Sequence, residues 1–102
     1  MPQAENTRII EIEEELEIKK PRQYAVVLFN DDFTPMDFVV SLLRSVFELN
    51  DEKAFEIMMK VHTTGSGVAG IYTREIAEHR AMRAEGLASH FEHPFRCEVA
   101  PV

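Results

Sequence analysis

The chain of 102 residues has no tryptophan, only four glycines and a single cysteine. Because Cys97 has no partner for an internal disulfide, the composition favours a reducing compartment. The longest apolar runs, 24–29 and 38–40, are far shorter than the ~20 residues of a membrane span. The opening MPQAENTRII lacks the basic region and apolar stretch of a secretory leader. We therefore expect a cytoplasmic protein that does not bind membranes.

Basic residues are also scarce. The chain has 11 Lys and Arg against 18 Asp and Glu, which gives a net charge of −7. Nucleic acids and anionic membranes require a basic surface, so neither is an expected partner. An acidic chain of this length is suited to a single small domain with cationic partners.

The composition divides the chain into two parts. Residues 1–21 contain six Glu and no aromatic residue, and they end at Lys20-Pro21, where proline discourages a continuing helix. We predict a flexible acidic N-terminal extension over 1–21 and a folded core domain over 22–102. A dispensable solvated tail is an equally good interpretation of the first part.

The core begins with a predicted strand over 23–29, because QYAVVLF is rich in β-branched and aromatic residues and is followed by Asn-Asp-Asp. A helix follows. Thr34 is expected as its N-cap, with Pro35 at the first helical position. Phe33 and Phe38 occupy the two positions of a hydrophobic staple.

The rest of the chain predicts two more helices and two more strands. They are a helix from Asn50 to a stop at Gly65, a strand over 68–72, a helix over 74–89 and a strand over 95–99. The last helix carries a stripe of small residues suited to close packing: Ala77, Ala81, Ala84 and Ala88. The order β-α-α-β-α-β predicts an α/β sandwich with helices packed on one three-stranded sheet.

Three motifs that resemble cofactor-binding, metal-binding or catalytic motifs have simpler explanations. The GSGVAG run at 65–70 matches the GxGxxG consensus of dinucleotide-binding proteins. It follows a predicted helix and leads into a predicted strand, whereas dinucleotide binding requires the motif between a strand and a helix. His90 and His93, even with His79, form a weak zinc signal, so no metal is expected. Cys97 lies within a predicted strand, where it acts as a small apolar side chain.

One polar cluster is harder to dismiss. Asn30, Asp31 and Asp32 leave the first strand together, which is more acceptor side chains than a turn requires. His62 lies near the end of the second helix, beside Met58 on an apolar face. These residues outline an apolar pocket with an acceptor-rich rim, although an ordinary turn and a core histidine also explain them.

The sequence resembles the ClpS family, the adaptors of the bacterial N-degron pathway, over residues 22–102. The resemblance lies in three stretches: FNDDFTPMDFVVSLL, MMKVHTTGSGVAGIYTREIAEHR and HPFRCEV. It implies three helices on a three-stranded antiparallel sheet, like the C-terminal domain of the bacterial ribosomal stalk protein. It also implies an adaptor without enzymatic activity, metal or cofactor, which binds proteins beginning with Leu, Phe, Tyr or Trp and delivers them to the ClpAP unfoldase–protease.

The resemblance also implies roles for particular residues. Asn30, Asp32 and His62 would hold the α-amino group of the substrate, and Asp31 would support the same rim. The substrate's first side chain would enter a pocket lined by Leu28, Thr34, Met36, Val39, Met58, Val61 and Phe95. Contacts with the N-terminal domain of the unfoldase ClpA would fall on Glu75 and Arg80, which the helical pattern places on an exposed side.

Two further expectations follow. The family's N-terminal extension is needed for delivery rather than for binding, and residues 1–21 fit that role by position. The alternative function is a small metal- or nucleotide-dependent enzyme that uses Asp31, Asp32 and His62.

Overall fold

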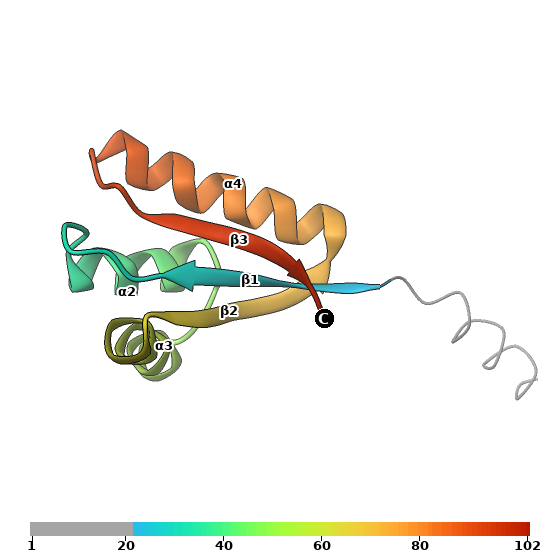
Figure 1. Ribbon diagram of the computed structural model, residues 1–102, viewed down its shortest axis with the longest axis horizontal. Coiled ribbons are helices and arrows are strands. Elements are labelled where there is room, and N and C mark those ends of the chain that lie inside the picture. Colours follow the sequence, from blue (N-terminus) through green and yellow to red (C-terminus); the bar gives the residue numbers. More distant parts are fainter. Residues whose placement is uncertain (1–21) are drawn as a thin grey trace, which may run out of the picture.

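The computed structural model describes residues 22–102. It contains three strands and three helices in the order β-α-α-β-α-β, as the sequence predicts (Figure 1). The elements are β1 (Gln23–Phe29), α2 (Met36–Ser45), α3 (Asp51–Thr64), β2 (Ser66–Thr73), α4 (Arg74–His90) and β3 (Arg96–Pro101). Residues 1–21, the predicted extension, lie outside the described residues. Within 22–102, no helix has the length and apolar character required to cross a bilayer.

The sheet has the strand order β2-β1-β3, and both neighbours pair with β1 in the antiparallel sense. Phe29, the last residue of β1, lies opposite Ser66 at the start of β2 and Arg96 at the start of β3. The register with β2 shifts between Val26 and Val27. This architecture confirms the expected fold class, including the strand directions implied by the resemblance.

The helices bury one face of the sheet. Val26 and Leu28 of β1 are fully buried, as expected where alternate side chains point toward a core. Helix α4 packs against all three strands, while α3 packs against β2 and α2 packs against α3. The predicted small-residue stripe is the buried face of α4, and its four members are Ala77, Ala81, Ala84 and Ala88. Short side chains allow the helix axis to approach the sheet closely.

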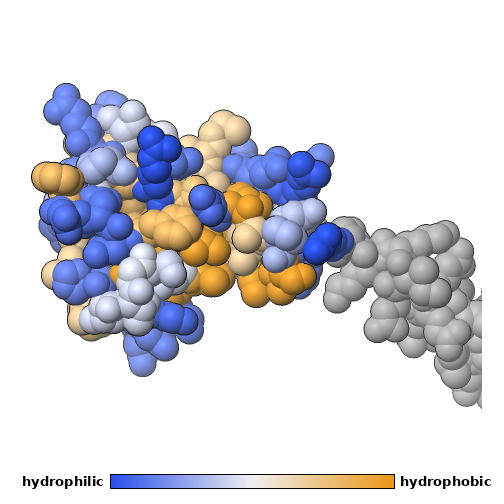
Figure 2. Space-filling model, in the orientation of Figure 1, coloured by the Kyte–Doolittle hydropathy of each residue, from blue (hydrophilic) through white to orange (hydrophobic). Residues whose placement is uncertain are grey.

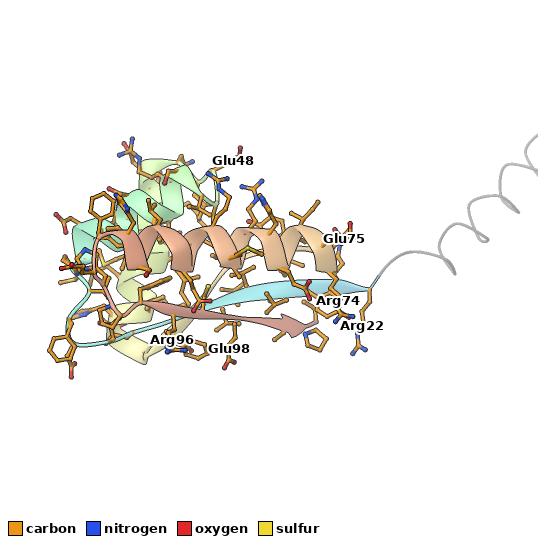
Figure 3. The ribbon with its side chains drawn as sticks, turned by 90° about the horizontal axis from the view of Figure 1, so that it is seen from above. Arg22, Glu48, Arg74, Glu75, Arg96 and Glu98 are labelled. Atoms are coloured by element: carbon orange, nitrogen blue, oxygen red, sulfur yellow. The ribbon has the colours of Figure 1, made fainter. Side chains whose placement is uncertain are left out.

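The opposite face of the sheet is not covered by any of the three helices within residues 22–102. Arg96 and Glu98 of β3 point away from α4 (Figure 3), and Glu98 lies opposite Val27 of β1. Val68 and Ile71 of β2 are about half exposed. Apolar side chains consequently gather over the strands in the space-filling view (Figure 2).

The start of α2 differs from its prediction. Pro35 occupies the N-cap position, and no side chain of the described residues 22–102 caps the helix. Thr34 instead donates both its backbone N–H and its hydroxyl to the carboxylate of Asp31, at 2.7 and 2.8 Å. The predicted cap is wrong because the Thr34 hydroxyl is already committed to that carboxylate.

The predicted hydrophobic staple is wrong as well. Phe33 is 79% exposed, so it does not pack on the first turn of α2. Phe38 packs in the other direction, edge-on to His93 at 4.6 Å and to Phe91 at 5.9 Å between ring centroids. The segment after α4, rather than Phe33, therefore supports the beginning of α2.

Both ends of α3 agree with the sequence. The Asn50 side chain accepts a hydrogen bond of 2.8 Å from the backbone N–H of Lys53, as an N-cap does. Gly65 ends the helix in the left-handed region at φ 96°, where a glycine is favoured. The chain reverses at Gly65 and enters β2 immediately.

Candidate functional site

A pocket of about 350 Å³ opens between the loop after β1 and the helices α2 and α3. The residues that line it are Asn30, Asp31, Asp32, Phe33, Thr34, Pro35, Met36, Val39, Met58, Val61 and His62. Most of the site residues expected from the sequence therefore meet in one hollow, although they come from three separate segments of the chain.

Backbone hydrogen bonds bring the polar residues of the pocket together. The N–H of Asn30 donates to the carbonyl of Gly65 at 3.0 Å, and the N–H of Gly65 donates to the carbonyl of Val61 at 2.9 Å. These bonds fasten the exit of β1 to the last turn of α3, which carries His62. Asn30, Asp32 and His62 are all exposed, so their polar groups form the rim.

The floor of the pocket is apolar. Val39 of α2 is 8% exposed, and Met58 and Val61 of α3 are 5% and 3% exposed. Met36, at the first turn of α2, is 45% exposed and forms part of the wall near the surface. The site therefore combines a buried hydrophobic floor with a rim of oxygen and nitrogen acceptors.

Gly67 allows α3 to pack closely against the sheet. A Cβ at this position of β2 would lie 3.0 Å from Cγ2 of Val61, which is closer than ordinary van der Waals contact. The absence of a side chain lets α3 approach β2 and places Val61 in the pocket floor.

Asp31 is occupied within its own loop. One carboxylate oxygen accepts the backbone N–H groups of Phe33 and Thr34 at 2.8 and 2.7 Å, and the other accepts the Thr34 hydroxyl at 2.8 Å. Partial desolvation raises the pKa of this carboxyl, but the bonds from Thr34 and Phe33, with the nearby His93, outweigh it and leave the pKa below its ordinary value. Asp31 thus holds the shape of the loop that presents Asn30 and Asp32.

Two predicted pocket residues lie elsewhere. Leu28 is fully buried and Phe95 is 4% exposed; both belong to the core and neither lines the pocket. Two residues that line the pocket were not predicted, namely Phe33 and Pro35. Their place in the same short loop as Asp32 and Thr34 was the available signal, but the staple interpretation assigned Phe33 to helix packing.

The two residues expected at the unfoldase contact differ in exposure. Glu75 is exposed in the first turn of α4 (Figure 3). Arg80 is not on an exposed side, because its side chain is only 20% exposed. Its guanidinium donates to the carbonyl of Val46 and to the carboxylate of Glu48.

The expected exposure of Arg80 was therefore wrong. The aromatic ring of Tyr72 also lies below the guanidinium, 5.6 Å from its centre. Arg80 ties α4 to the segment that follows α2, and only part of its side chain remains available to a partner.

The structure also shows where the metal-binding, glycine-rich and cysteine motifs lie. Within residues 22–102, no three His, Cys, Asp or Glu side chains are placed to hold a metal ion. The glycine run forms the end of α3 and then strand β2, so it does not lead from a strand into a helix. Cys97 is buried, and desolvation with the nearby Glu85 raises the pKa of its thiol to about 12. A thiol with this pKa is a poor nucleophile.

The chemistry of the pocket suits a ligand with two unlike parts. Acceptors on the rim match a compact cation that has several hydrogen-bond donors. The floor matches an apolar group attached close to that cation.

Comparisons with known proteins assign the family. The family described as ATP-dependent Clp protease adaptor protein ClpS matches residues 19–98, and the chain belongs to this family. It is 47% identical over 85 residues to the ATP-dependent Clp protease adapter protein ClpS of Hydrogenovibrio crunogenus. The aligned region covers 83% of this chain and 82% of that protein. The structure of Agrobacterium tumefaciens ClpS2 bound to L-phenylalaninamide is similar at a TM-score of 0.79 and 35% identity, over 81% of this chain and all of that one.

Proposed function

We propose that this protein binds the N-terminus of other proteins when the first residue is Leu, Phe, Tyr or Trp. The observation that carries the proposal is a single pocket with an acceptor rim over an apolar floor. L-Phenylalaninamide, the ligand of the similar ClpS2 structure, has the matching chemistry, because its free α-amino group is next to an aromatic side chain.

The rim is suited to the α-amino group. A protonated amine has three hydrogen-bond donors and no acceptor, so its best receiver is a set of convergent acceptors with negative charge. Asn30 supplies an amide oxygen, Asp32 a carboxylate and His62 a ring nitrogen. An interior residue of a protein has no such amine, so the site recognises only the start of a chain.

The energies are consistent with reversible binding. Burial of a Leu or Phe side chain contributes ~1.5–3 kcal/mol, and two or three charge-assisted hydrogen bonds contribute ~1.5–3 kcal/mol each. The gross sum is about 4.5–12 kcal/mol, so after an association cost of at least ~4 kcal/mol its upper end corresponds to the ~−8 kcal/mol of a micromolar complex. Neither part is sufficient alone, so the site requires the amine and the apolar side chain together.

Steric restriction at Met36 selects among apolar residues. Met36 lies in the wall of the pocket near the surface, where it meets the first carbons of an entering side chain. Val and Ile branch at Cβ, and a clash there costs ~1–3 kcal/mol. Leu and the aromatic residues branch further out and avoid it.

We further propose that the protein is a non-enzymatic adaptor that delivers its ligands to the ClpAP unfoldase–protease. The family membership supports this role. Glu75 and the accessible part of Arg80 are the proposed contacts with the N-terminal domain of ClpA, and residues 1–21 are the proposed extension for delivery. Deletion of 1–21 should stop degradation by ClpAP while leaving peptide affinity unchanged.

Titration calorimetry tests the proposal against the alternative enzyme. A panel of peptides that differ only in the first residue is titrated with and without a metal chelator. We expect binding for Leu, Phe, Tyr and Trp, none for Ser or Asp, and no effect of the chelator. Dependence on a metal ion would instead favour the enzyme that uses Asp31, Asp32 and His62.

A further inference from the structure

A second hollow lies on the other side of two methionines that line the pocket. It has a volume of about 530 Å³ and runs between α2 and α3. We call it the α2–α3 groove, and its lining residues are Met36, Asp37, Val40, Ser41, Phe55, Met58 and Met59. Met36 and Met58 also line the pocket, so one pair of side chains separates the two hollows.

Packing of the core explains only part of the apolar character of the groove: Met58 belongs to the core and Val40 and Met59 pack against it, whereas Met36 and Phe55 do neither. Phe55 is 57% exposed and Met36 is 45% exposed, although large apolar side chains usually become buried when the core has room for them. Along α3, Phe55, Met58 and His62 follow one another at helical spacing. This face of α3 therefore carries the exposed Phe55 in the groove, the buried Met58 between the two hollows and His62 at the rim of the pocket.

We propose that the α2–α3 groove binds the side chain of the third residue of the substrate, which makes the site specific for more than the first residue. This inference rests on the proposed function. In an extended peptide, residues one and three point to the same side and lie about 7 Å apart. A first side chain in the pocket then places the third beyond the Met36–Met58 wall, while the second side chain points away.

The groove accepts an apolar side chain. Its walls are formed by methionine, valine and phenylalanine, and methionine adapts to ligands of different shapes. The carboxylate of Asp37 lies at the same groove, so an acidic third residue would be repelled there. The occupant is thus an apolar third residue of a chain whose α-amino group is held at the rim.

Three peptides test the inference by fluorescence anisotropy. They begin Leu-Ser-Leu, Leu-Leu-Ser and Leu-Ser-Ser and are otherwise identical. We expect Leu-Ser-Leu to bind about tenfold more tightly than Leu-Ser-Ser, because a further apolar side chain is buried. Leu-Leu-Ser should bind like Leu-Ser-Ser. A preference confined to the second position, or equal affinity for all three peptides, would overturn the inference.

Phe55→Ala provides the matched test in the protein. Phe55 is exposed and not part of the core cluster, so the variant should fold normally. It should bind Leu-Ser-Leu and Leu-Ser-Ser with nearly the same affinity. The control is Met82→Ala, which removes a 69% exposed side chain from α4 and should keep the tenfold preference. Retention of the preference by Phe55→Ala would exclude the groove.

The same experiment distinguishes a failure of this inference from a failure of the proposed function. If no Leu-led peptide binds to the unchanged protein, the proposed function is wrong. If all three bind equally while the Ser-led peptide of the calorimetry panel does not bind, the pocket is correct and only the groove is wrong.

Discussion

Asp31 and Asp32 are adjacent and chemically identical, yet the structure predicts that only one of them contributes to the stability of the domain. Asp31 accepts three hydrogen bonds from its own loop. Asp32 is exposed and accepts no hydrogen bond from residues 22–102. Asp31→Ala should therefore reduce the stability of the domain, whereas Asp32→Ala should reduce only the affinity for substrate.

The magnitudes follow from these bonds. Hydrogen bonds contribute ~0.5–1.5 kcal/mol each, and somewhat more when one partner is charged. For three bonds at a partly solvated carboxylate, we expect Asp31→Ala to lose about 2–3 kcal/mol of unfolding free energy. In a domain of this size that lowers the Tm by about 10 °C or more. Asp32→Ala should change stability by less than ~0.5 kcal/mol.

Both variants should lose affinity for substrate, but for different reasons. Asp32→Ala removes one proposed charge-assisted contact with the α-amino group, which corresponds to a roughly 10- to 100-fold loss. Asp31→Ala leaves the ligand contacts in place but requires binding to order the loop, at ~1–2 kcal/mol for each backbone residue fixed. Its affinity should therefore also fall about tenfold, together with the loss of stability.

Thermal unfolding and peptide titration on both variants provide the assay, with Asp31→Asn as the control that keeps an oxygen for the two backbone donors. The folded state holds the pKa of Asp31 below its ordinary value of 3.8. The stabilisation by its charge is thus present above pH 3.8 and lost as the pH falls through the lowered pKa. An Asp31→Ala variant with an unchanged Tm would refute this role.

Three further predictions concern other parts of the domain. Gly67→Ala should destabilise the fold by ~1–3 kcal/mol in denaturant titration, because its Cβ would crowd Val61. Gly86→Ala should instead stabilise the fold by ~0.5–1 kcal/mol, because a Cβ at this position of α4 meets open space. Equal effects of the two substitutions would contradict the close packing at Gly67. Cys97, with a pKa raised to about 12, should react with iodoacetamide at pH 8 only after unfolding; rapid alkylation of the folded protein would contradict its burial. Met36→Ala should admit peptides that begin with Ile or Val, and unchanged selectivity would exclude Met36 as the steric gate.

The order of the elements was predictable because the signals were local. The run QYAVVLF gave β1, the side chain of Asn50 gave the start of α3, and Gly65 gave its end. The start of α2 was not predictable. Thr34 has the expected character of an N-cap, but Asp31 competes for its hydroxyl. Only the folded loop decides which partner it takes.

The site was predictable in its polar part, since three acceptor residues at the exit of a strand are conspicuous in a sequence. The apolar part depended on the family resemblance and on packing in three dimensions. Leu28 and Phe95 are buried in the core and are not among the residues that line the pocket. The burial of Arg80 depends on the carbonyl of Val46, 34 residues away along the chain. The α2–α3 groove requires the relative placement of two helices, which helical spacing alone does not give.

The most direct measurement compares one Phe-led peptide in two forms, with a free and with an acetylated N-terminus. Acetylation removes the positive charge and two of the three donors while leaving the phenyl side chain intact. We predict micromolar binding of the free peptide and at least a 100-fold loss for the acetylated one. Equal affinity of the two forms would contradict recognition of the α-amino group by Asn30, Asp32 and His62.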